Sequence, residues 1–398
     1  MNKKPTIVSL FSGAGGMDLG FKLAGYEILF ANDFFKEAVD TYRKNVDTNI
    51  VCGDITKIDS SSIPDNPDVI VGGFPCQGFS IANSNRSMND ERNFLYKELL
   101  RIIKDKQPKF FVAENVKGLL SMEKGKIIEL IIKDFEEIGY KVNYKLLNAA
   151  EYGVPQMRQR VIIIGNRIGA DNPFPKPTHY IEKPEKGKMK CPTVRDTIEE
   201  LANIPLSDGT IKLKSGKTIN GHIAYTNVKD KFYGRKYEVN QIELCDYLRK
   251  YRSLSKMSNK KISEALGIKQ TTVDHWFRND NNSGSIPDKK DYLALKKLLN
   301  LDDTYDKVLT EYELKEIKFE QSLRITNWDR PSDTITATSP EIHINKERRL
   351  SVRECARLQT FPDDFEFFGT LEKQYRQVGN AVPVLLAKII PEEIYKFL

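Results

Sequence analysis

The chain has 398 residues, a length typical of two or three domains. With 40% hydrophobic and 29% charged residues it is neither disordered nor membrane-embedded in composition, and its apolar runs are far shorter than a bilayer span. The net charge of +7 permits a polyanionic partner without requiring one. Five cysteines with no Cys-x-x-Cys pair argue against a disulfide framework or a zinc site, so we expect a cytoplasmic protein without a metal.

Positive charge is concentrated in one stretch of the chain. Residues 225–280 contain 12 Lys and Arg against 7 Asp and Glu, which accounts for +5 of the net +7. A solvated helical face would have this composition, and so would a surface that binds nucleic acid. Charge alone leaves both interpretations open.

The first 170 residues alternate short apolar runs with helical patterns. The predicted strands are residues 6–10, 27–31, 69–71, 110–113, 141–147 and 161–165, and the predicted helices between the early strands are 17–24, 35–45, 94–104 and 126–138. This alternation predicts a doubly wound α/β sheet with its ligands at the carboxyl ends of the strands. The last two strands have no helix between them, which predicts an antiparallel hairpin at the sheet edge.

After residue 172 the pattern changes. Five prolines between residues 173 and 192 mark an irregular crossing out of the first domain. We therefore divide the chain into a first domain at 1–178, a smaller second domain at 179–325 and a return to the first domain at 326–398. In the returning segment, Ser351-Val352-Arg353-Glu354 is typical of a capping box at the start of a helix.

A glycine-rich turn follows the first predicted strand. In Phe11-Ser12-Gly13-Ala14-Gly15-Gly16 the glycines let the backbone approach a ligand, and the helix start that follows favours a negative group. Asp33 ends the second strand, where an acid can accept both hydroxyls of a ribose. The third glycine of a dinucleotide-binding turn is replaced by Asp18, which predicts an adenosine cofactor without a pyrophosphate.

Two further groups are expected at the same edge of the sheet. Cys76 follows the strand 69–71 within Gly73-Phe74-Pro75-Cys76-Gln77, where Pro75 stiffens the turn. Glu114 ends the neighbouring strand within Glu114-Asn115-Val116. A lone cysteine is most often a small buried hydrophobe. A cysteine and an acid on neighbouring strand ends, above an adenosine site, instead suggest a nucleophile and a general acid.

These motifs resemble those of the bacterial cytosine-5 DNA methyltransferases of the restriction–modification type. Besides the glycine loop, the nucleophile motif and the acid motif, the chain has that family's Gln-x-Arg-x-Arg motif at 156–160, the motif that closes the target-recognition region at 330–334 and the final motif at 379–383. All six lie in the family's order. The resemblance implies the S-adenosylmethionine-dependent methyltransferase sheet with a smaller target-recognition domain. It also implies S-adenosylmethionine as cofactor and S-adenosylhomocysteine as product.

The implied chemistry explains the residue types. Carbon 5 of cytosine is a poor nucleophile, so the thiolate of Cys76 first attacks carbon 6 of a cytosine flipped out of the duplex. Glu114 would protonate ring nitrogen 3, and carbon 5 then accepts the methyl group without help from a metal. Arg158 and Arg160 are expected around the flipped base and its phosphate, with Arg160 nearest the pyrimidine. A solvated basic loop is the alternative for these two arginines.

The resemblance also assigns cofactor contacts. Asp54 matches the residue that hydrogen-bonds the adenine amino group and Asn380 a residue near the methionine end, although both could be ordinary turn residues. The full predicted set is Phe11, Ser12, Gly13, Gly15, Asp33, Phe34, Asp54, Ile55, Pro75 and Asn380. The polar segment 81–93 is expected to be a mobile loop that closes over DNA, or else a surface loop without function.

A second recognisable unit lies in the basic stretch. Residues 260–268 are predicted to form a short helix ending in a glycine turn and 270–278 the next helix, with flanking helices at 241–252 and 288–299. This pattern, spanning about 241–299, resembles a helix-turn-helix of the phage-repressor type, whose second helix enters the major groove at its N-terminal end. The residues expected to face DNA are Lys269, Gln270, Thr271, His275 and Arg278. A helical filler would bury the same apolar positions, Ile262, Leu266, Ile268, Val273 and Trp276.

Two alternatives remain open at this point. The eukaryotic relative of this family that methylates tRNA has a similar length, but its nucleophile region usually carries a second proline where this chain has Gly73-Phe74, and it lacks a helix-turn-helix. The second alternative is a DNA-binding regulator on a degenerate methyltransferase fold, against which intact Cys76, Glu114, Arg158 and Arg160 argue. We expect a monomer that acts on double-stranded DNA, with a cognate restriction endonuclease as a further partner.

Overall fold

The computed structural model describes residues 3–75, 95–226, 228, 233–235, 241–278, 286–312, 314–316, 324–338 and 341–398. Contacts divide the chain into two compact units, one formed by residues 1–228 with 321–398 and the other by 229–320. The second unit is smaller than the second domain that we predicted at 179–325, because residues 179–228 pack with the first unit.

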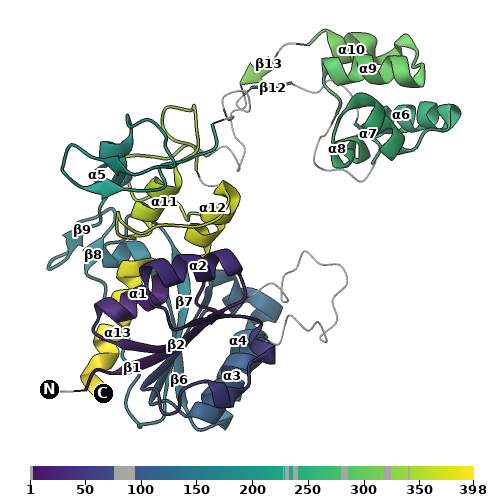
Figure 1. The fold of residues 1–398 in the computed structure, drawn as a ribbon. Coiled ribbons are helices and arrows are strands. Elements are labelled where there is room, and N and C mark those ends of the chain that lie inside the picture. Colours follow the sequence, from purple (N-terminus) through teal and green to yellow (C-terminus); the bar gives the residue numbers. More distant parts are fainter. Residues whose placement is uncertain are drawn as a thin grey trace. The chain divides into compact units, whose positions relative to one another are not determined.

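The first unit is built around a seven-stranded sheet of order β3-β2-β1-β4-β5-β7-β6 (Figure 1). Its strands are β1 (Thr6–Leu10), β2 (Glu27–Asp33), β3 (Ile50–Cys52), β4 (Val69–Gly72), β5 (Phe110–Val116), β6 (Lys141–Asn148) and β7 (Gln159–Asn166). The strands from β3 to β5 are parallel, whereas β7 is antiparallel to both of its neighbours. The doubly wound sheet and the edge hairpin are thus confirmed. Sequence patterning missed β3, which is short and largely exposed.

Helices cover both faces of this sheet (Figure 1). They are α1 (Gly16–Leu23), α2 (Lys36–Asn45) and α13 (Val384–Ile394) on one face, and α3 (Leu95–Lys106) and α4 (Lys126–Glu137) on the other. Successive side chains of a strand point to opposite faces. Ile7 and Val69 accordingly pack on the α1 side and Val8 and Ile70 on the α3 side. With both faces covered, the carboxyl ends of the strands are the place for a ligand.

The returning segment closes the unit. Helix α11 (Val352–Leu358) begins with the predicted capping box. The Ser351 hydroxyl accepts a hydrogen bond from the backbone N–H of Glu354, and the Glu354 carboxylate accepts one from the backbone N–H of Ser351. Helix α13 packs closely against α1 at Gly20, where a Cβ would lie 2.5 Å from Ala387. The end of the chain therefore completes the core that its beginning starts.

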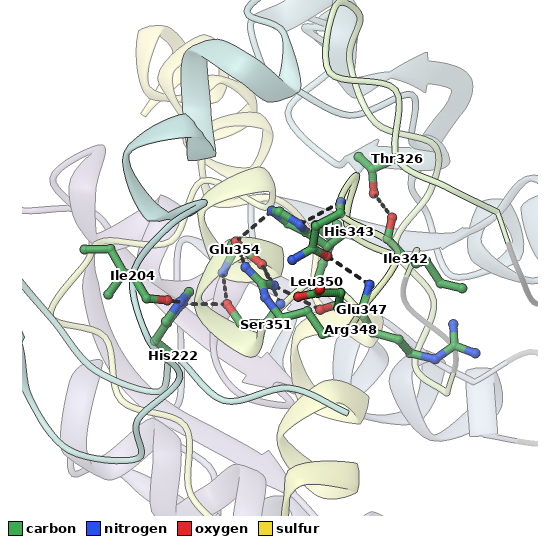
Figure 2. A network of polar contacts seen from close by, with 12 residues as sticks. Ile204, His222, Thr326, Ile342, His343, Glu347, Arg348, Leu350, Ser351 and Glu354 are labelled. Carbon is green, nitrogen blue, oxygen red and sulfur yellow. Dashed lines mark hydrogen bonds and ion pairs between the residues drawn. The ribbon is translucent and has the colours of Figure 1, made fainter. Parts of the chain in front are cut away.

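A buried polar network fixes this segment (Figure 2). Arg348 donates through both terminal nitrogens to the Glu354 carboxylate, over 2.6 and 2.8 Å. The Ser351 hydroxyl lies 3.0 Å from Nδ1 of His222, whose Nε2 lies 3.1 Å from the carbonyl oxygen of Ile204. Because a carbonyl can only accept, His222 carries its proton on Nε2 and accepts at Nδ1 from Ser351. Residues 204 and 222 are thereby tied to the start of α11.

The second unit is mainly helical. Its elements are α6 (Gln241–Ser255), α7 (Asn259–Leu266), α8 (Gln270–Trp276), α9 (Lys289–Leu299) and α10 (Asp306–Thr310), with the short strands β12 (Tyr233–Arg235) and β13 (Leu314–Glu316). The four helices predicted at 241–299 are confirmed, with small shifts at their ends. Ile262, Val273 and Trp276 are buried in a separate core, against which Leu266 and Ile268 pack. No helix in the described parts of either unit is both long and apolar enough to cross a membrane.

Candidate active site

The glycine-rich turn between β1 and α1 has an unusual backbone. Phe11 and Gly13 have φ of 56° and 55°, the left-handed region that L side chains rarely adopt. The backbone N–H of Gly13 donates to one oxygen of the Asp33 carboxylate over 2.8 Å, and that of Phe35 donates to the other oxygen over 2.8 Å. One acidic side chain thus holds the strained turn against the end of β2.

Two buried carboxylates adjoin this turn. Burial raises the pKa of Asp33, although its backbone hydrogen bonds and the charge of Arg376 partly oppose the rise. Burial also raises the pKa of Asp18 to about 6, against the hydrogen bonds donated by Tyr42 and Ser9, each 2.7 Å long. The residue in place of the third glycine is therefore a buried acid.

The turn opens into a cleft of about 900 Å³ at the carboxyl ends of the strands. The predicted cofactor residues that line it are Phe11, Ser12, Gly13, Asp33, Phe34, Asp54, Ile55, Pro75 and Asn380. Phe34 presents an exposed ring, and Asp54 accepts the N–H and the hydroxyl of Thr56 through a single oxygen. Gly15 does not line the cleft. A Cβ there would lie 2.7 Å from Val46, so Gly15 serves helix packing instead.

Glu114 and Arg160 form an ion pair in the cleft, with Nε of Arg160 2.7 Å from Oε1 of Glu114. Glu114 pairs with Ile162 between β5 and β7, which makes Arg160 its diagonal neighbour on the same face. This Oε1 is buried and has no well-aligned hydrogen bond within the described residues. A Cβ on Gly73 would lie 3.3 Å from the other carboxylate oxygen, so a larger residue there would crowd Glu114.

Asn115 fixes the turn that leads to the predicted nucleophile. Its side-chain amide donates to the carbonyl oxygen of Phe74 over 3.0 Å, and both residues are buried. Pro75 follows and lines the cleft. Cys76 and the predicted loop at 81–93 lie outside the described residues. The chain is therefore held at the cleft up to the residue before the predicted nucleophile.

The structure corrects the expected place of Arg158. We predicted this side chain beside the flipped base, but it is completely buried and does not line the cleft. Its guanidinium donates to the carbonyl oxygens of Ile335 and Gly379 over 3.1 and 2.9 Å, and burial lowers its pKa. Gln156 contacts the same segment, since its Oε1 accepts the N–H of Ile335 over 3.0 Å. Arg158 thus joins the start of β7 to the returning chain.

Sequence patterning missed one charged residue of the cleft. Arg376, on α12 (Leu371–Asn380), lines it with its guanidinium 4.8 Å from the centroid of the Phe35 ring. Residues four apart share a face of a helix, so Arg376 lies on the same side as Asn380. The four-residue spacing from Asn380 was the sequence signal that could have identified Arg376 as a cleft residue.

The lining fits an adenosine cofactor that carries a positive centre. Its charged residues are Asp18, Asp33, Asp54, Glu114, Arg160 and Arg376, so acids outnumber bases. An acid at the end of β2 can accept ribose hydroxyls, and an excess of carboxylates favours a cation such as a sulfonium. Within the described residues, no group of three or more His, Cys, Asp or Glu side chains could hold a metal ion.

The predicted DNA-facing residues lie on or beside α8. Lys269, Gln270, Thr271 and Arg278 are exposed, and His275 is partly exposed. Gln270 also lines a hollow of about 510 Å³ whose wall includes Arg252, Lys256 and Lys260. The start of α8 therefore adjoins a basic surface.

Comparison with known proteins identifies the family. The family model described as C-5 cytosine-specific DNA methylase matches residues 5–396. Type II methyltransferase M.NgoFVII of Neisseria gonorrhoeae is 37% identical over 402 residues, covering 98% of this chain and 87% of its own. M.FnuDI of Fusobacterium nucleatum is 37% identical over 414 residues, covering 98% and 93%. The solved S. pombe Dnmt2 methyltransferase shares the fold, with a TM-score of 0.53 at 15% identity over 99% of both chains. The chain therefore belongs to the family of C-5 cytosine-specific DNA methylases.

Proposed function

We propose that this DNA methylase transfers the methyl group of S-adenosylmethionine to carbon 5 of a cytosine flipped out of a specific duplex sequence. The observation that carries the proposal is the ion pair of Glu114 and Arg160, in a cleft that Asp33 and Phe34 also line. One cleft that is lined by both pairs of residues supports a binding site for the base next to a binding site for the cofactor.

Three side chains divide the work on the base. The thiolate of Cys76 attacks carbon 6, which makes carbon 5 nucleophilic. Glu114 takes up a proton from solvent and gives it to ring nitrogen 3, which relieves the negative charge that the attack places on the ring. Arg160 holds the Glu114 carboxylate in position through the ion pair. Loss of the carbon-5 proton to water, departure of Cys76 as a thiolate and return of the nitrogen-3 proton to Glu114 restore the aromatic base.

Other residues of the cleft hold the cofactor, which when bound supplies a methyl group on a good leaving group. Asp33 accepts hydrogen bonds from the ribose hydroxyls. It uses the carboxylate lone pairs that the backbone N–H groups of Gly13 and Phe35 do not occupy. The exposed ring of Phe34 covers the adenine. The Asp54 carboxylate accepts a hydrogen bond from the adenine amino group. Asn380 lies at the methionine end. Gly13 has no atom within 4 Å of a Cβ position, so a ligand can approach its backbone.

We predict that Cys76 becomes covalently attached to DNA that contains 5-fluorocytosine. Fluorine at carbon 5 cannot leave as a proton does, so the adduct should persist and migrate as a protein–DNA complex on a denaturing gel. The Cys76→Ser variant should lose this complex. Cys52→Ser is the matched control, since Cys52 is an exposed free cysteine and its loss should leave trapping unchanged. Efficient trapping by Cys76→Ser would overturn the nucleophile assignment.

We further propose that the helices at 241–299 read the target sequence. The support is an exposed Gln270 at the start of α8, next to the basic wall formed by Arg252, Lys256 and Lys260. A glutamine can read adenine through two hydrogen bonds, whereas lysine and arginine contact phosphates.

Gln270→Ala and Arg278→Ala should therefore have different effects on DNA binding. A lost base contact costs about 1–3 kcal/mol at one position of the site, as expected for Gln270. A lost phosphate contact, as expected for Arg278, weakens binding to all sequences and reduces its salt dependence. Titrations on cognate and single-mismatch duplexes at several salt concentrations measure both, with exposed Lys297 of α9 replaced by alanine as the control. Unchanged discrimination in both variants would make the helical unit a spacer.

The two relatives named above are Type II methyltransferases, which supports a role in a restriction–modification system. We propose that methylation protects DNA from a cognate restriction endonuclease. We also propose that the enzyme acts as a cytoplasmic monomer. Incubation of DNA and of tRNA with radiolabelled S-adenosylmethionine tests the substrate. We expect label in DNA only. Label in tRNA alone would favour the tRNA-modifying alternative, and label in neither a regulator without activity.

A further inference from the structure

Arg376 is a cation in an acidic cleft, without an ion-pair partner among the residues that the structure describes. Of the two arginines in the lining, Arg160 is taken by Glu114 at 2.7 Å. Arg376 makes no ion pair with any residue that the structure describes. Its guanidinium instead lies over the Phe35 ring, 4.8 Å from the centroid, which restricts its movement and leaves its N–H groups to a ligand.

The position of Arg376 assigns it to the cofactor half of the cleft. It contacts Phe35, next to Asp33 at the end of β2, and its charge acts on the Asp33 carboxylate. Glu114, the group expected at the base, lies on β5, three strands further along the sheet. Arg376 also shares a helix face with Asn380, the residue expected at the methionine end.

We propose that Arg376 binds the carboxylate of the methionine end of S-adenosylmethionine, an inference that rests on the proposed function. The carboxylate is the only anionic group of this cofactor, and the four acids of the lining would repel it. A guanidinium offers two parallel N–H donors that match a carboxylate. Arg376 thus allows a carboxylate to bind in an otherwise acidic cleft, and it binds the amino-acid end of the cofactor.

The test compares two ligands that differ only in this group, S-adenosylmethionine and its decarboxylated form, by calorimetry on the full chain. Wild type should prefer S-adenosylmethionine by roughly tenfold to hundredfold, the range for a hydrogen bond to a charged group. Arg376→Met should lose this preference and keep its affinity for the decarboxylated form, which shows that the variant is folded. Arg376→Lys should keep part of the preference. Lys373→Met, one turn earlier on α12 and outside the cleft lining, should behave as wild type.

The alternatives give distinct results. Equal weakening of both ligands in Arg376→Met, or no change in either, would overturn the inference and leave the proposed function standing. Weaker DNA binding with an unchanged ligand preference would overturn it in favour of a phosphate contact. If wild type bound neither ligand and methylated no DNA, the proposed function itself would fail, and the inference with it.

Discussion

Replacing Glu114 by glutamine should reduce turnover by about two to four orders of magnitude, the usual range for a lost acid–base group. Glutamine has nearly the shape of glutamate but cannot deliver a proton to ring nitrogen 3. Because Glu114 lies on β5 and its partner Arg160 on β7, away from Asp33 on β2, affinity for S-adenosylmethionine should stay near that of wild type. Steady-state methylation of cognate DNA and calorimetry with the cofactor measure the two quantities.

The matched control for this variant is Glu137→Gln. Glu137 is an exposed glutamate at the end of α4 that pairs with Lys133 across one helical turn, so its loss should not affect the reaction. Loss of cofactor binding in Glu114→Gln would make Glu114 a cofactor ligand, whereas unchanged turnover would remove it from the chemistry altogether.

The sequence predicted most of the sheet because its strands carry strong local signals. β1, β4, β5 and β7 are apolar runs buried on both faces, which fix both their identity and their approximate ends. The connection between β6 and β7 holds only a short 3₁₀ helix at Ala149–Tyr152 and no crossover α-helix, so an antiparallel hairpin followed directly. β3 has only three residues and no such run, and its place depends on pairing with β2.

The candidate site was predictable where a residue's role depends on its own strand or turn. Glu114 and Asp33 lie at strand ends, and the structure brings both to one cleft. Arg158 could not be placed in this way, because its partners Ile335 and Gly379 are 177 and 221 residues away in the chain. A motif arginine two residues before Arg160 has the same sequence context whether it contacts a base or supports the fold.

The second compact unit begins later in the chain than the predicted second domain, for a related reason. The prolines after residue 172 do mark the end of the main sheet, but the segment that follows, which has only short strands and helices, stays with the first unit. The contacts that hold it there include that of His222 with Ser351, 129 residues away in sequence, and the backbone hydrogen bonds from Val352 to Ile223 and from Arg353 to Gly221. Composition reports where the main sheet ends, and only tertiary contacts decide to which unit the next segment belongs.

The second large effect is expected from Glu354, at the centre of the network in Figure 2. Its buried carboxylate accepts two bonds from Arg348 and one from the backbone of Ser351, and His343 lies 3.8 Å away. In Glu354→Gln the Arg348 guanidinium would remain buried without its counter-charge. Removing one partner of a buried ion pair typically costs about 3–5 kcal/mol of the free energy of unfolding. Urea denaturation at neutral pH measures this cost.

The control for this stability effect is Glu393→Gln, which breaks the ion pair of Glu393 with Lys396 on the surface and should cost less than about 1 kcal/mol.

The pH dependence gives a second test. Burial alone would raise the pKa of Glu354, but the hydrogen bonds and charge of Arg348 outweigh it and hold the pKa below the ordinary value of 4.5. A depressed pKa means that the carboxylate stabilises the fold fully above pH 4.5 and loses this contribution as the pH falls through the lowered value. The difference in unfolding free energy between wild type and Glu354→Gln should therefore be constant above pH 4.5 and narrow below it. Equal costs for the two glutamate variants, or a difference that grows in acid, would show that the buried pair does not stabilise the attachment of the returning segment.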